Sequence, residues 1–183
     1  MNPQEVRGLD VGLMWQLRGT RFGSFDVDVE MARLLKYYRT PSPGIQDLLN
    51  AQSSGQINAG VTITGGGNLL RQNGAPATKV SASLTWHYSQ VTVGAFTKYI
   101  SNMQDTNLLS ADGTPWLVSS QVTGNLYGQY EFARGRLPGA RIRLGVNNIT
   151  NEPPPLASGA FGYIGSEYQP YARYWYGSVG IRF

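Results

Sequence analysis

Cysteine is absent from this sequence of 183 residues, which excludes a disulfide scaffold, a cysteine-based metal site and a cysteine nucleophile. Long apolar runs are also absent, because none approaches the roughly 18 residues of a transmembrane helix. Charged residues are sparse at 14%, and the arginines behind the net charge of +4 are scattered. Nucleic-acid binders instead gather basic residues into a compact stripe. No nucleophile has a base at a plausible spacing. We therefore expect no enzyme, no cofactor and no nucleic-acid partner.

The last residues of the chain carry the clearest pattern. Apolar side chains at Trp175, Val179 and Ile181 alternate with polar ones, and the chain closes on Phe183. Terminal residues of water-soluble proteins usually fray and are polar. This ending therefore predicts an amphipathic strand with one apolar face.

Six earlier runs alternate with the same period of two, which is the period of a β-strand. They lie at residues 6–17, 22–37, 79–88, 91–100, 121–132 and 141–149. Strands of soluble sandwiches are usually about 5–6 residues long. A strand tilted across a bilayer needs roughly 9–11 residues. The length of most of these runs favours strands that span a membrane.

Short and long connections alternate along the chain. Residues 18–21, 89–90 and 133–139 are short connections, whereas 38–78, 101–120 and 150–170 are long and rich in Gly, Pro, Asn and Ser. Transmembrane barrels combine short periplasmic turns with long extracellular loops. The sequence therefore predicts an all-β fold, an antiparallel transmembrane β-barrel segment of about seven strands. Its lipid-facing residues would include Leu13, Val29, Leu84, Leu144 and Val179, and its lumen-facing residues Asp28, Ser83, Gln129 and Arg143.

Two hairpin registers follow from the pattern, because apolar residues must face one another. A turn about Thr20 would pair Trp15 with Phe25. A two-residue turn at 89–90 would pair Tyr88 with Val91.

Residues 145–155 read Gly-Val-Asn-Asn-Ile-Thr-Asn-Glu-Pro-Pro-Pro. The asparagines can cap the exit turn of a strand, and the prolines end its hydrogen-bond ladder. This stretch, followed by a last strand ending in Phe, resembles the C-terminal region of TonB-dependent outer-membrane receptors. Residues 2–10 and 34–37 also resemble segments of these receptors, so the resemblance covers essentially the whole chain.

The resemblance implies a barrel of about 22 strands closed by a plug, of which residues 1–183 would be the C-terminal portion. It places the chain in a Gram-negative outer membrane, with lipid, lipopolysaccharide and the β-barrel assembly machinery as partners. TonB would act through an N-terminal region that has no counterpart in this sequence. The commonest cargo is an iron–siderophore complex, while carbohydrate and cobalamin complexes remain open. Val179, Ile181 and Phe183 would form the assembly signal.

The start of the chain has neither the basic region nor the apolar region of a secretory signal peptide. Seven strands is also an odd number, whereas bacterial single-chain barrels have even strand counts. Both features suggest a fragment of a longer protein that lacks its plug and signal peptide.

Three residues before the first long connection, Tyr37, Tyr38 and Arg39, are candidate ligand contacts at the outer mouth, although an interfacial aromatic belt explains the tyrosines equally well. The acidic residues Asp26, Asp28 and Glu30 share one face and could bind a cation, but a hydrated lumen wall with arginine partners is the simpler interpretation. His87, the only histidine, has no second ligand to form a metal site. The sequence therefore predicts neither a metal site nor a catalytic residue.

Arg7 and Arg33 have the parity of lipid-facing residues although both are charged. They lie about 13 residues from the first turn, roughly 30 Å up a tilted strand and above an apolar band of about 25 Å. In the predicted register they are cross-strand neighbours, and two adjacent like charges favour an anion between them. We predict a lipopolysaccharide-phosphate site there, with two solvated rim charges as the alternative.

The sequence leaves two other functions open. A small structural or adhesion barrel would require eight strands and a signal peptide. A soluble carbohydrate-binding β-sandwich would dissolve without detergent. The preferred interpretation is a receptor and transporter segment for the uptake of a scarce nutrient.

Overall fold

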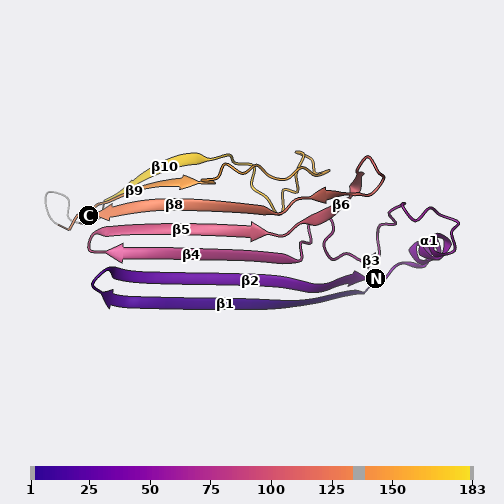
Figure 1. Cartoon of the computed structure of the whole chain (residues 1–183), viewed down its shortest axis with the longest axis horizontal. Helices are drawn as coiled ribbons and strands as arrows, with labels where there is room; N and C mark the ends of the chain where they lie inside the picture. The colour runs from indigo at the N-terminus through magenta and orange to yellow at the C-terminus, as the bar shows by residue number, and fades with distance from the viewer. Residues whose placement is uncertain (1–2, 134–138, 182–183) are drawn as a thin grey trace.

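The computed structural model describes residues 3–133 and 139–181, and its main feature is one large antiparallel sheet (Figure 1). Seven strands pair in chain order, each with the next: β1 (Gln4–Thr20), β2 (Gly23–Arg39), β4 (Thr78–Tyr88), β5 (Val91–Ile100), β8 (Gln121–Glu131), β9 (Arg141–Asn147) and β10 (Tyr174–Gly180). These are the seven predicted strands. Among the described residues no ladder joins β1 to β10, so the sheet is open and the closed barrel remains a prediction.

Four further elements lie in connections for which the sequence predicted only loops: α1 (Pro43–Ser53), β3 (Gly67–Asn68), β6 (Met103–Leu109) and β7 (Pro115–Val118). The helix starts where Pro43 occupies its first turn, a position that suits the fixed φ of proline. Strand β3 pairs with β2, and β6 with β7 forms a separate two-stranded sheet. No helix in the described part of the chain is long and apolar enough to cross a membrane.

The predicted register of the first hairpin is wrong by two residues. Trp15 pairs with Val27 rather than Phe25, because the turn centres on Arg21 and Phe22 and not on Thr20. Glycine makes this turn possible, since Gly23 has a φ of 104°. A shift of two residues keeps every side chain on its predicted face. The register of the second hairpin, with Tyr88 opposite Val91, is confirmed.

The sheet has one apolar and one polar face, and the ladders assign the residues to these faces as predicted. The register places Leu13 opposite Val29 on the apolar face, and Asp28 opposite Ser83 on the polar face. The apolar face is uncovered: Leu13 is 59% exposed and Leu144 is 66% exposed. An apolar surface of this extent indicates a protein or membrane interface.

The long connections lie at one end of the sheet and the short turns at the other. Figure 1 shows α1, β3 and β6 at the end that holds the N-terminus, and the β1–β2 and β4–β5 turns at the opposite end. Most of connection 133–139 is outside the described residues. The two connections 18–21 and 89–90 therefore support the sorting by length that the sequence predicted.

The main buried cluster lies at the end of the sheet that holds the long connections. It consists of Ile100, Met103, Val118, Ala157 and Tyr168, with Trp116, Tyr163 and Ile164 packed around it. The end of β5 and residues of the second and third long connections thus bury one another at this end of the sheet. We call the three connections, residues 40–77, 101–120 and 148–173, the loop cap.

On the polar face, Tyr127 lies across Gly94 of the neighbouring strand. A Cβ atom at Gly94 would stand 2.2 Å from Cε1 of Tyr127. Gly94→Ala is therefore expected to destabilise the sheet by about 1–3 kcal/mol, the usual cost of overpacking. Urea titration in detergent micelles measures the change. Gly128→Ala is the matched control, because no atom lies within 4 Å of its Cβ position. Equal losses in the two variants would contradict this close packing.

Candidate functional site

Hydrogen bonds join the first and second connections of the loop cap. Asn73 and Thr106 bond twice: Nδ2 of Asn73 donates to Oγ1 of Thr106 over 2.7 Å, and the Thr106 amide donates to Oδ1 of Asn73 over 2.9 Å. Arg71 donates to Oδ1 of Asn102 over 2.8 Å. These bonds fix the segment around Asn73, which passes over the polar face of the sheet.

The second and third connections are joined through Asp105, which is buried. Its carboxylate accepts hydrogen bonds from the backbone amide and the hydroxyl of Ser158, the latter over 2.9 Å. Trp116 adds a bond from its indole nitrogen to the carbonyl of Leu156 over 2.9 Å. Burial by itself would raise the pKa of Asp105, but the hydrogen bonds from Ser158 and Asn107 outweigh it and hold the pKa below its ordinary value.

This pKa makes the loop cap sensitive to acid. A carboxyl whose folded pKa lies below its unfolded value of about 3.9 stabilises the fold above that value and loses the contribution as the pH falls through the folded pKa. We expect the amide of Ser158 to exchange faster below a pH of about 4, after correction for intrinsic rates. Asp105→Asn should exchange faster already at neutral pH and lose this pH dependence. Asp47→Asn, on α1, should behave as the wild type, and an unchanged pH profile in Asp105→Asn would contradict the assignment.

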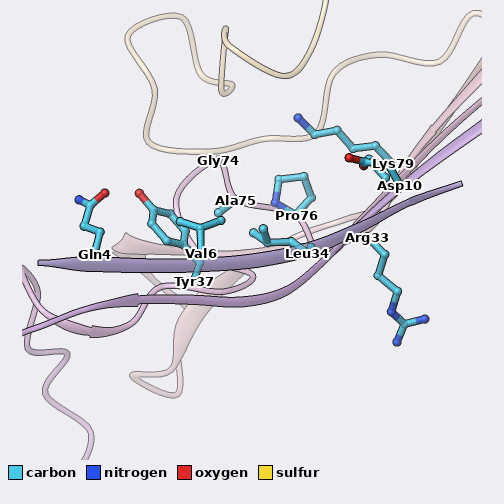
Figure 2. Close-up of a pocket in the computed structure, with 12 residues that line it drawn as sticks. Gln4, Val6, Asp10, Arg33, Leu34, Tyr37, Gly74, Ala75, Pro76 and Lys79 are labelled. Atoms are coloured by element: carbon cyan, nitrogen blue, oxygen red, sulfur yellow. The ribbon is translucent and has the colours of Figure 1, made fainter.

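A cavity of about 610 Å³, the edge cavity, lies between β1, β2 and the segment that the loop cap places over them (Figure 2). Its walls are mainly apolar, and polar groups stand at its ends. Figure 2 shows Tyr37 beside Val6 at one end, and Asp10 and Lys79 directed to the same side at the other. The full lining consists of Gln4, Val6, Gly8, Asp10, Ala32, Arg33, Leu34, Tyr37, Gly74, Ala75, Pro76 and Lys79. This arrangement suits a ligand with an apolar body and polar ends.

A second cavity of about 520 Å³, the loop cavity, adjoins the first. Tyr37, Gly74 and Ala75 line both cavities. Arg39 adds a guanidinium group to the loop cavity, together with backbone from the segment around Gly65–Gly67. Guanidinium and phenol groups together can bind the oxygen atoms of an anionic ligand. The glycine run Gly65–Gly67 thus lines a wall of the loop cavity.

Two of the three predicted ligand contacts meet at these cavities, and the third does not. Tyr37 and Arg39 line them, whereas Tyr38 pairs with Glu5 in the ladder and stacks below Lys36, whose ammonium lies 5.8 Å from the ring centroid. The reason is a bulge: between Arg7 and Gly8 the register shifts, so that β2 contains one extra residue, Leu35. After this bulge, each side chain of β2 lies on the face opposite to the one that strict alternation from the turn would give it.

The predicted pairing of Arg7 with Arg33 is wrong. Arg33 pairs with Leu9 and Arg7 with Lys36, because the turn register and the bulge both differ from the prediction. Arg7 also forms an ion pair with Glu5 over 2.7 Å. The parity is nevertheless as expected, since Figure 2 shows Arg33 pointing away from the side of Asp10 and Lys79. The lipopolysaccharide-phosphate site at Arg7 and Arg33 stays a prediction, now with the two arginines as diagonal neighbours.

Other predicted residues have the following places. Asp26 accepts two hydrogen bonds from Arg18, over 3.0 and 2.6 Å, and lies 3.6 Å from His87. The described residues contain no group of three or more His, Asp or Glu side chains that could hold a metal ion. Val179 and Ile181 of the predicted assembly signal are exposed, and Val179 lies opposite Ile142 on the apolar face. Phe183 lies outside the described residues.

One contact near the cavities could not be predicted from the sequence. Lys79, which lines the edge cavity, forms an ion pair over 2.6 Å with Glu167 of the third connection. The two residues are far apart in the chain, and neither belongs to a motif. Only the packing of the loop cap brings them together.

No protein-family model matches the chain, and no curated protein matches it. A solved structure with a similar fold is that of a mutant of the ferric enterobactin receptor from Pseudomonas aeruginosa. The match covers 95% of this chain with a TM-score of 0.53 and a sequence identity of 14%. The chain spans 22% of the length of that receptor chain. At this identity the likeness shows a shared fold.

Proposed function

We propose that this chain is the C-terminal portion of the barrel of a TonB-dependent outer-membrane receptor, which binds a scarce nutrient outside the cell and admits it to the periplasm. The uncovered apolar face of the large sheet is the observation that carries the proposal. Its opposite face is polar, and long connections gather at one end. A transmembrane barrel has lipid outside, a hydrated lumen inside and long loops on one side.

The topology supports the same proposal. All seven main strands follow chain order and run antiparallel, as in a barrel wall. A soluble sandwich instead needs a second sheet packed on the first, about 10 Å away. In the described ranges 3–133 and 139–181 no second sheet contacts either face of the large one.

The proposed cargo site consists of the edge cavity and the loop cavity, which share Tyr37. An iron–siderophore complex is the first candidate cargo. Such a complex presents oxygen atoms around the metal and apolar or aromatic groups around its rim. Arg39 and Tyr37 would bind the oxygens, and the apolar wall of the edge cavity would contact the organic body. The ferric enterobactin receptor of similar fold supports this choice of cargo.

The absence of native cysteine allows a direct test of the membrane orientation. The variants Leu84→Cys and Ser83→Cys place a spin label on adjacent residues of β4 that face opposite sides. In phospholipid vesicles the label at position 84 should collide mainly with oxygen dissolved in the bilayer. The label at position 83 should collide mainly with a water-soluble nickel chelate. Similar accessibility at both positions would contradict a membrane-spanning sheet.

Cargo is tested separately by titrating the chain in detergent with ferric enterobactin and following tryptophan fluorescence. Arg39→Gln should weaken binding roughly 10- to 100-fold, the range for a hydrogen bond to a charged group. Lys36→Gln is the matched control, because Lys36 lies on the opposite face. Binding of cobalamin or maltotriose in place of ferric enterobactin would change the cargo class and leave the membrane assignment intact.

A further inference from the structure

A third cavity, the amide pocket, lies on the polar face and is separate from the edge cavity and the loop cavity. It has a volume of about 250 Å³, and it shares no lining residue with the edge cavity or the loop cavity. Strand β8, on its floor, lies three strand spacings from β2, a distance of roughly 14 Å across the sheet. The sheet forms its floor and the third connection its roof, with lining residues Lys98, Gln121, Thr123, Asn125, Asn147, Asn148, Glu167, Gln169, Tyr171 and Tyr174.

The two charged residues that line the pocket, Lys98 and Glu167, have opposite signs, so the lining carries no net charge. The carboxylate of Glu167 is held by Lys79 over 2.6 Å, and its side chain is only 9% exposed. The ammonium of Lys98 donates to the backbone carbonyl of Glu167 over 3.3 Å. The remaining lining is amide, hydroxyl and phenol. The pocket therefore favours a neutral ligand.

The walls are held by hydrogen bonds that use only some of these polar groups. Gln121 donates to the carbonyl of Pro153 over 2.9 Å, and Asn148 donates to the carbonyl of Tyr171 over 3.0 Å. Neither bond involves the side chains of Thr123, Asn147 or Gln169. These three side chains thus stand on fixed walls and can offer both donors and acceptors to a ligand.

Two aromatic rings form a corner beside the amides. The ring centroids of Tyr171 and Tyr174 are 5.9 Å apart, and the ring planes meet at 72°. Both rings are exposed, at 60% and 44%. A ring face of this kind can pack against an apolar surface of C–H groups, while the phenol remains available for a hydrogen bond.

We propose that the amide pocket binds one pyranose ring of a neutral saccharide. A pyranose carries several hydroxyl groups, each both donor and acceptor, which match amide and hydroxyl side chains. It also has an apolar C–H face that can stack on Tyr174. The pocket is smaller than the roughly 300–1,000 Å³ of sites for drug-sized ligands, so it accommodates a single ring. This proposal does not depend on which cargo binds at the edge cavity and the loop cavity.

Saturation-transfer difference NMR of the full chain tests this site, with methyl glycosides of glucose, galactose, mannose and N-acetylglucosamine as probes. The detergent must carry no sugar, so dodecylphosphocholine is used. We expect transfer to the ring C–H protons of at least one glycoside, with a dissociation constant of about 1 mM. Thr123→Val and Gln169→Leu should each weaken binding roughly three- to tenfold, the effect of one lost hydrogen bond.

These two variants preserve shape, and Thr123→Val keeps a β-branched residue in β8, so folding should be retained. The matched control is Gln16→Ala, an exposed amide in β1 on the same face of the sheet. Weakening in both pocket variants but not in the control supports the saccharide site. The absence of transfer to all four glycosides would overturn it, as would equal transfer in the wild type and both pocket variants.

Discussion

Lysine in place of Leu84 is expected to destabilise the chain in phospholipid vesicles by about 2–4 kcal/mol. Leu84 lies in the middle of β4 on the apolar face, where it pairs with Val27 and Ala95. A charged side chain on the lipid face near mid-bilayer costs this much, and the cost falls toward the interfaces. Urea titration of the vesicle-bound chain, followed by tryptophan fluorescence, measures the loss.

Ser83→Lys provides the matched control, because Ser83 precedes Leu84 at nearly the same depth but faces the polar side. Its cost should be far smaller, since its ammonium can stay hydrated. Equal costs at the two positions would mean that both faces meet the same environment. That result would remove the membrane assignment along with the receptor proposal.

Asn148→Ala should release the third connection of the loop cap. Asn148 is buried and its side chain bonds at both ends of that connection: to the amide and carbonyl of Glu152 over 2.9 and 2.8 Å, and to the carbonyl of Tyr171 over 3.0 Å. Its φ of 51° is unfavourable for alanine. Each buried polar group left unpaired costs about 1–3 kcal/mol, so the free energy of local unfolding of this connection should fall by roughly 3–5 kcal/mol. Hydrogen exchange of residues 149–173 should accelerate accordingly.

Asn148→Gly separates the loss of the side-chain hydrogen bonds from the backbone strain, because glycine accepts the positive φ but lacks the amide. Most of the acceleration should persist in this variant. Asn151→Ala is a milder comparison, since Asn151 makes one such bond, to the Arg173 amide over 2.9 Å. Unchanged exchange in Asn148→Gly would show that backbone conformation, and not the side-chain bonds, holds the connection.

The sequence predicted the sheet well because alternation is a local signal. Each of the seven main strands shows it, and the ladders join strands that are neighbours in the chain. The capping role of the asparagines in 145–155 was predictable for the same reason, since Asn148 and Asn151 act on residues close in sequence or at the other end of one loop.

The loop cap and most of the candidate site could not be predicted. Met103 and Val118 are buried against residues of the third connection, and no periodicity marks such contacts. The predicted register of the first hairpin is wrong because Gly19 and Gly23, both with positive φ, allow a two-residue turn at Arg21 and Phe22 in place of a turn centred on Thr20. The bulge decides that Tyr37, and not Tyr38, faces the cavities. Alternation alone does not reveal a bulge.

That bulge gives β2 a spare residue. Losing one codon inside a strand normally turns every later side chain to the other face. Here the pairs on either side of Leu35, Gly8 with Leu34 and Arg7 with Lys36, already leave it without a partner in the ladder. A gene that lost the codon for Leu35 should still encode a strand that presents Tyr37 and Arg39 to the cavities. The same in-frame loss near Val29 would instead turn the residues between that position and the bulge, such as Met31, to the wrong face. Tolerance to the loss of one residue of β2 should therefore be greatest at Leu35.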